Sequence, residues 1–265
     1  MRCLILRLDG PLMAFGDVAV DEIRPTRNLP TLSMLTGLLG NALGYDHRDG
    51  ERLQRLQGRL RLAARPDRSG QILVDYQTAR LNKRDPLWTT YGVPGERAGG
   101  GTTWDSAQFG TVERWRHYLA DAVVTVALAL EPAEEPPTVA DLAAALGRPE
   151  RPLFLGRKGC PPATPLLLAG PSEQASLTAA LAGVPPCRPL PDATDPRIEV
   201  DDLDGEPEGR RALEGADRRD WRGGFHTGTR RVRELTTSVA GAPGGAPPGA
   251  RPCSPSAPRP AGPPR

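Results

Sequence analysis

The segment RPTRNLPTLSMLTGLLGNALG, residues 24–44, contains the clearest helix signal in the 265-residue chain, and the other predicted elements are placed relative to it. Its two prolines favour extended backbone over residues 24–30, because proline disfavours the α conformation in the residue before it. Thr31 is expected to cap a helix, and apolar side chains then recur at helical spacing as far as Gly44, where a glycine typically ends a helix. The segment predicts a basic extended loop that leads directly into the first helix.

Elements on both sides of this helix give an α+β pattern. Residues 3–8 are apolar apart from one arginine, as in a strand that is buried on both faces. The remaining sequence predicts helices at 51–57 and 113–120, strands at 59–64, 71–78, 123–130 and 153–155, and a helix at 139–146 with a capping box between Thr138 and Asp141. This order fits a ferredoxin-like (RRM-like) βαββαβ domain, a shape that RNA-recognition domains also use.

Residues 79–112 have no clear period and are long for a structureless connection in a compact domain, so we interpret them as a projecting arm or thumb. Cations and aromatic residues alternate in and beside this arm: Tyr76, Arg80, Lys83, Arg84, Trp88, Tyr91, Arg97 and Trp104. RNA bases stack on aromatic rings, and phosphates pair with arginine and lysine. The alternative is that the aromatic residues hold the arm against its own domain.

The second part of the chain gives weaker signals. We assign residues 1–160 to the ferredoxin-like domain and residues 161–239 to a small β-rich C-terminal subdomain. Residues 192–208 hold eight acidic residues and one arginine, and we expect them to be exposed. Residues 240–265 contain nine prolines and five glycines, too little apolar surface to order themselves, which predicts a disordered tail.

The basic loop before the first helix is one candidate for a nucleic-acid site. Guanidinium groups there and the backbone N–H groups of a helix N-terminus can bind the same phosphate. The candidate residues of this loop and of the first helical turn are Arg24, Arg27, Thr31 and Ser33. The alternative is a solvated loop in which the arginines pair with Asp21 and Glu22.

Two other basic segments are further candidates. In the sequence Gly156-Arg157-Lys158-Gly159, the glycines permit close approach of the backbone and the cations neutralise phosphate. The alternative is an ordinary glycine-rich turn. A third group consists of Arg230, Arg231 and Arg233, for which the alternative is a solvated strand face.

Composition limits the possible functions. The formal net charge is only +2, so a nucleic-acid partner has to be inferred from local clusters of charge. The four cysteines form no C-x-x-C pair and the three histidines have no metal-binding spacing, which argues against a metal site. No apolar run has the length of a membrane span, and the N-terminus lacks a signal-peptide pattern, so we expect a cytoplasmic protein with no membrane partner.

Four segments in this order resemble the CasD family of type I-E CRISPR Cascade subunits: RPTRNLPTLSMLTGLLGNALG, VDYQTARLN, WRHYLADAVVTVALAL and LFLGRKGCPPATPLLLAG. The resemblance covers approximately residues 1–235. It implies a fold of the repeat-associated mysterious protein (RAMP) superfamily, with its thumb at about 79–112 and GRKG as its glycine-rich loop. It also implies an antiviral RNA-binding subunit that holds the 5′ handle of the CRISPR RNA, contacts the CasC backbone and the CasA large subunit, and meets target DNA only indirectly.

The resemblance implies no cofactor and no catalytic residues, because a separate subunit, CasE, cuts the precursor RNA. Two other functions stay open. A metal-independent ribonuclease would need an acid and a base, which His117 with Tyr118, or His226, could supply in part. A protein–protein adaptor with incidental basic loops would bind no RNA.

Overall fold

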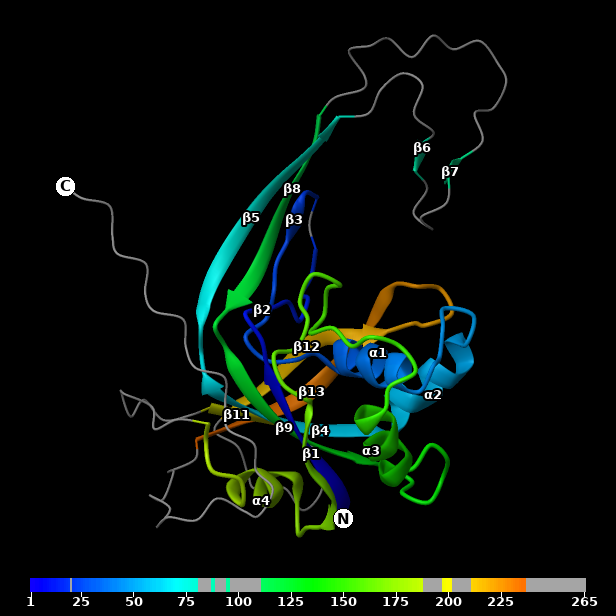
Figure 1. The fold of residues 1–265 in the computed structure, drawn as a ribbon, viewed down its shortest axis with the longest axis vertical. Coiled ribbons are helices and arrows are strands. Elements are labelled where there is room, and N and C mark those ends of the chain that lie inside the picture. The colour runs from blue at the N-terminus through cyan, green and yellow to red at the C-terminus, as the bar shows by residue number, and fades with distance from the viewer. Residues whose placement is uncertain are drawn as a thin grey trace, which may run out of the picture.

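The computed structural model describes the following residues: 1–19, 21–80, 87–88, 94–95, 111–187, 197–201 and 211–236 (Figure 1). The helices in this part of the chain are α1 (Leu32–Ala42), α2 (Gly50–Arg59), α3 (Val139–Gly147) and α4 (Leu177–Ala182). A large antiparallel sheet has the strand order β10 (Leu167–Glu173), β1 (Arg2–Asp9), β9 (Val123–Leu130), β4 (Leu60–Arg68), β11 (Arg197–Asp201), β13 (His226–Thr236) and β12 (Arg211–Arg219). In a second sheet, β8 (Thr111–Ala120) pairs with β2 (Leu12–Met13), β3 (Ile23–Arg24) and β5 (Gln71–Arg80). A separate two-stranded sheet consists of β6 (Leu87–Trp88) and β7 (Pro94–Gly95). The protein is therefore of mixed α+β class.

The large sheet is centred on β1 and β9, which are apolar on both faces. Every residue of β9 is buried, as is every residue of β1 after Arg2. Leucines and valines of these strands pack with α1, α2 and α3 in one core, while Cys3, Ile5, Ala127 and Ala129 pack with α4 in a second core. Each leucine or valine buried in this way contributes roughly 1.5–3 kcal/mol, so these two strands anchor both layers.

The predicted helix caps are confirmed. The Thr31 hydroxyl accepts a hydrogen bond from the Met34 backbone N–H at 3.2 Å, and α1 begins at the next residue. Thr138 and Asp141 form the capping box of α3. The hydrogen bonds that the Asp141 carboxylate accepts from the backbone and side chain of Thr138 lower its pKa. The capping residues of the local sequence therefore mark where these two helices begin.

A long hairpin projects from the body of the protein (Figure 1). Its strands β5 and β8 pair over ten consecutive residues without a register shift. The projection therefore starts at Gln71, eight residues before the predicted arm. Most of its distal part, including residues 81–86 and 96–110, lies outside the described residues.

Two predicted elements are wrong. Residues 113–120 form strand β8 rather than a helix, because pairing with β5 on one side and with β2 and β3 on the other satisfies their backbone. Residues 153–155 form no strand, because the backbone of Leu155 bonds instead to Ala14 and Cys160 in a tight loop. On the side of β1 away from β9 lies β10, which includes Leu167, Leu168 and Ala169 of the PLLLAG segment.

Strands β11, β13 and β12 extend the large sheet and hold a buried ion cluster. The Arg230 guanidinium contacts the Asp201 carboxylate at 2.5 Å and the Asp217 carboxylate at 2.8 Å. Asp217 also accepts a hydrogen bond from the Leu32 backbone N–H at 3.1 Å, and Asp201 accepts one from Leu62 at 2.8 Å. All three charged side chains of this cluster are buried. Arg230 is therefore not on a solvated strand face, and the acidic 192–208 segment is not exposed at Asp201.

Candidate nucleic-acid interface

Strand β3 pairs with β8 at the base of the projecting β5–β8 hairpin. We call the sheet of these three strands the blade. In the pairing register, Arg24 lies opposite Arg116, and Arg116 lies opposite Asp75. Side chains at directly opposed positions share a face of the sheet, and successive residues alternate between faces. Arg114 and Tyr118, two residues before and after Arg116, therefore lie on this same face. We call the face with Arg24, Arg114, Arg116 and Tyr118 the basic face.

The glycine-rich loop joins the basic face through Arg157. The Arg157 guanidinium donates to the His117 carbonyl oxygen at 2.9 Å and to the Arg24 carbonyl oxygen at 3.0 Å. The same guanidinium lies over the Tyr118 ring, 4.6 Å from its centroid. One side chain thus fixes together two basic segments that are 133 residues apart in sequence, and the next residue of the loop is the exposed Lys158.

Gly156 is the residue that permits this loop geometry. Its φ angle is +98°, a region that favours glycine, and a Cβ atom placed there would overlap the carbonyl oxygen of Ala14. The neighbouring peptide is fixed because Ala14 N–H donates to the Leu155 carbonyl oxygen at 3.0 Å. Gly159 differs, since nothing lies within 4 Å of a Cβ atom at that position. Of the two glycines, only Gly156 is required by packing.

The loop ends at Cys160, a free and fully buried cysteine. Burial raises the pKa of its thiol, so little thiolate forms near neutral pH. We expect iodoacetamide at pH 8 to leave Cys160 of the folded protein unmodified and to modify it readily in urea. Mass spectrometry of the alkylated peptide measures this, and rapid modification of the native protein would show that the loop is open.

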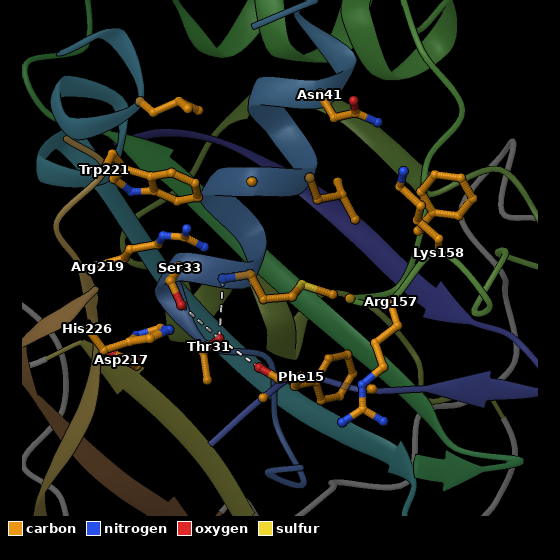
Figure 2. Close-up of a pocket in the computed structure, with 18 of the residues that line it drawn as sticks. Phe15, Thr31, Ser33, Asn41, Arg157, Lys158, Asp217, Arg219, Trp221 and His226 are labelled. Atoms are coloured by element: carbon orange, nitrogen blue, oxygen red, sulfur yellow. Dashed lines mark hydrogen bonds between the residues drawn. The ribbon is translucent and has the colours of Figure 1, made fainter. Parts of the chain in front are cut away.

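A cavity of about 800 Å³ extends from this loop across the exposed side of α1 (Figure 2). Residues from three regions line it: Thr31, Ser33, Gly37 and Asn41 beside α1, Gly156, Arg157 and Lys158 in the loop, and Arg219, Trp221 and His226 near the β12–β13 turn. Its volume and its mixture of aromatic and cationic side chains suit a nucleotide.

Trp221 provides an aromatic surface in this cavity. Its indole N–H donates to the side-chain oxygen of Gln57 at 3.1 Å, and its backbone N–H donates to the side-chain oxygen of Gln54 at 3.0 Å. The Arg219 guanidinium lies over the ring, 4.9 Å from the centroid. Gly37 of α1 faces the indole, and a Cβ atom there would approach the ring to 3.4 Å. The indole is therefore fixed in position at the wall of the cavity.

The structure places the other predicted residues of the first loop in structural contacts. Arg27 pairs with Glu199 at 3.8 Å. Thr31 and Ser33 are buried, and the Thr31 hydroxyl donates to the Phe15 carbonyl oxygen at 2.9 Å. The Arg24 guanidinium donates to the backbone carbonyl oxygen of Asp21 at 2.5 Å, and its side chain remains partly exposed to solvent. The loop therefore brings Arg24, rather than all four residues, to the basic face.

Of the predicted arm residues, Tyr76 is the one whose side chain lies within the described part of the chain. Tyr76 lies on the opposite face of the blade, where its ring is 5.0 Å from that of Trp115, and a hydrogen bond to Glu113 raises the pKa of its hydroxyl. Arg80 is the last residue of β5, and Lys83, Arg84 and Arg97 lie outside the described residues. Sequence reasoning missed Arg114 and Arg116, because VERWRHYL was interpreted as a helix, whereas it forms part of strand β8.

The described residues also limit the chemistry. None of them form a group of three or more His, Cys, Asp or Glu side chains that could hold a metal ion. His226 lines the cavity, where burial and Arg219 lower its pKa, while His117 lies on the face of the blade opposite the basic face. His117 and its predicted partner Tyr118 are successive residues of β8 and lie on opposite faces of the blade. None of the helices in the described ranges is long and apolar enough to cross a membrane.

Two solved structures share this fold over most of the chain. A chain of a CRISPR RNA-guided surveillance complex superposes with a TM-score of 0.61 at 25% identity, covering 89% of this chain and 90% of that one. A structure described as a Cas protein superposes with the same TM-score at 28% identity, covering 92% of this chain and all of that one. Both structural matches indicate a CRISPR-associated protein.

Sequence comparison gives the family. The model of the family CRISPR-associated protein (Cas_Cas5) matches residues 3–233, and the chain belongs to this family. The CRISPR system Cascade subunit CasD of Escherichia coli (strain K12) is 37% identical over 165 residues, which are 62% of this chain and 69% of that protein. The resemblance to CasD that the sequence segments indicated is confirmed.

Proposed function

We propose that this protein is the CasD subunit of a CRISPR Cascade surveillance complex and that it binds the 5′ handle of the CRISPR RNA on the basic face. The family and the CasD relative support the first part. The observation that carries the second part is the arrangement around Arg157, which fixes the glycine-rich loop beside Arg24 and the blade. Three cationic segments distant in sequence then face one region of solvent.

The proposed RNA path runs from the blade into the cavity above α1. Arg24, Arg114 and Arg116 are suited to phosphates, because within the described residues none of them forms an ion pair with a carboxylate. Lys158 continues the positive charge toward the cavity, where a splayed base can stack on Trp221. Recognition of an unpaired handle by stacking and by 2′-hydroxyl contacts fits this arrangement better than reading of a duplex groove.

The proposal also includes a ferredoxin-like core. The antiparallel order β10-β1-β9-β4 supports it, since these strands alternate along the chain with α1 and α3 as a βαββαβ unit requires. We keep as proposals the division into residues 1–160 and 161–239 and the disordered tail from 240. The arm residues Arg80, Lys83, Arg84 and Arg97 remain proposed RNA contacts of the thumb.

The proposed partners are those of a Cascade subunit. We infer contacts with the CasC backbone and the CasA large subunit, an indirect relation to target DNA, and a cytoplasmic location. The CasD relative, a Cascade subunit by name, supports this assignment. We also propose that the protein has no catalytic role of its own.

Removal of two cations from the basic face tests RNA binding. The double variant Arg24→Ala plus Arg116→Ala is expected to weaken binding of handle RNA about tenfold and to reduce the slope of log affinity against log salt by about 1.4, near 0.7 for each lost phosphate contact on a single strand. Fluorescence anisotropy at several salt concentrations measures both. The control Arg52→Ala plus Arg55→Ala removes the same charge from the exposed surface of α2. Equal affinities and slopes for the two variants would contradict the proposal.

The ribonuclease alternative is tested directly. We expect labelled repeat RNA to remain intact after incubation with the purified protein in EDTA, because His117 and Tyr118, the predicted acid–base pair, lie on opposite faces of the blade. Denaturing gel electrophoresis measures the products. A defined cleavage product that disappears in His226→Ala would favour the enzyme instead.

A further inference from the structure

The face of the blade opposite the basic face is apolar and exposed. Ile23 lies opposite Trp115, and Trp115 lies opposite Tyr76, so these side chains form a row across three strands. Ile72 and Val74 lie on the same face as Tyr76, because every second residue of strand β5 points to the same side of the sheet. Ile23, Ile72, Val74 and Tyr76 are 48%, 52%, 50% and 52% exposed. We call these five residues the apolar face.

The apolar face adjoins a free strand edge. Strand β5 pairs with β8 on one side, and no strand within the described ranges pairs with its other side. Natural edge strands are usually protected by lysine, proline, a bulge or short length. Residues 71–79 contain no lysine or proline, and β5 pairs with β8 in an unbroken register. An unprotected edge of this length is typical of a strand that is covered in the working assembly.

We propose that an extended segment of a neighbouring protein subunit pairs with the free edge of β5 and packs its apolar side chains on the apolar face. The inference rests on the proposed function in one respect, namely that the chain works as a subunit of a larger complex. Main-chain hydrogen bonds at the edge supply affinity in such strand addition, and the side chains on one face supply specificity.

Charge identifies the occupant as protein rather than RNA. Residues 71–79 of β5 carry a single charge, the carboxylate of Asp75, and the apolar face has neither arginine nor lysine. The carboxylate of Glu113, beside this face, takes part in the hydrogen bond with the Tyr76 hydroxyl. In the described part of this face, phosphates would find no arginine or lysine and only the imidazole of His117, whereas the basic face offers several guanidinium groups. The blade thus separates its two partners, with RNA on one face and protein on the other.

The blade is also stiff enough for this role. The Tyr76 and Trp115 rings pack together across β5 and β8, and the pairing of these strands continues over ten residues. The Arg157 contacts with Tyr118 and the β3 backbone hold the hairpin base from the other face. A preformed edge loses little conformational entropy when a partner strand binds.

Threonine substitutions on each face of β5 test the proposal. Ile72→Thr plus Val74→Thr removes apolar surface but keeps β-branched side chains that favour a strand. Leu73→Thr is the matched control, because Leu73 is exposed on the opposite face of the same strand. Each full-length variant is co-expressed with the other subunits of its complex, one of which carries an affinity tag, and its molar ratio in the purified complex is measured.

We expect the double variant to be reduced at least about tenfold in the complex and, as an isolated protein, to bind handle RNA as the unaltered protein does, while the control is retained in the complex. Hydrogen exchange of β5 amides should slow at least about tenfold on assembly of the unaltered complex, as new edge hydrogen bonds form. Full retention of the double variant with unchanged β5 exchange would overturn the inference. A dimer of the isolated chain that the double variant abolishes would assign the edge to a second copy and overturn it as well. Failure of the proposed RNA function would appear separately, as a lack of RNA binding by the unaltered protein.

Discussion

Gly156→Ala is expected to destabilise the protein by about 2–4 kcal/mol and to abolish most of its affinity for handle RNA. The added Cβ would overlap the Ala14 carbonyl oxygen, and the φ angle of +98° is unfavourable for any residue with a side chain. The loop has to move to relieve the overlap. Arg157 then loses its hydrogen bonds to His117 and Arg24, and the three cationic segments separate.

The neighbouring glycine provides the control for this prediction. Gly159→Ala adds the same methyl group to the same loop, at a position with open space around it. We expect its unfolding free energy in urea to lie within about 0.5 kcal/mol of the unaltered protein. If both variants lose stability and RNA affinity equally, the effect comes from loop flexibility in general, and the specific role of Gly156 is wrong.

Arg230→Met is expected to be the most destabilising substitution, by about 3–5 kcal/mol, because it leaves two buried carboxylates without their cation. Asp201 and Asp217 are each at most 5% exposed. Burial already raises the pKa of Asp201 in the intact cluster, and attraction to Arg230 opposes that rise. Loss of Arg230 would also release Asp217 from its position at the N-terminus of α1, so the β12–β13 turn and Trp221 would lose their support.

Two further variants make this prediction specific. Arg231→Met, at the exposed neighbouring position of β13, is expected to change the unfolding free energy by no more than about 0.5 kcal/mol. Adding Asp201→Asn and Asp217→Asn to Arg230→Met removes the uncompensated charges while keeping acceptors for Leu62 and Leu32, and it should recover part of the lost stability. A triple variant less stable than Arg230→Met would contradict an electrostatic origin.

Elements with local signals were predictable from sequence. Helix α1 follows its Thr31 cap, α3 follows its capping box, and β9 is an unbroken apolar run buried throughout. Strand β8 was not predictable in this way, because apolar and polar residues in WRHYLA fit a helix as well as a strand over so short a length. Only the pairing with β5 decides it, and that pairing spans residues far apart in sequence.

The candidate site shows the same division. Arg24, Arg157 and Lys158 could be selected from their basic segments, but their meeting depends on a contact across 133 residues. Arg230 was assigned to the wrong environment, because its two carboxylate partners lie on other strands. The separation of the blade into a basic and an apolar face follows from the register between β3, β8 and β5, which no single segment reveals.

Site-specific photocrosslinking tests the central claim most directly. p-Benzoylphenylalanine would replace Lys158, in the glycine-rich loop that lines the cavity, or Val74, on the apolar face, in the assembled complex carrying its RNA. After irradiation, position 158 is predicted to crosslink to the 5′ handle of the CRISPR RNA, and position 74 to crosslink to protein without RNA. RNA crosslinks from position 74, together with none from position 158, would contradict the account.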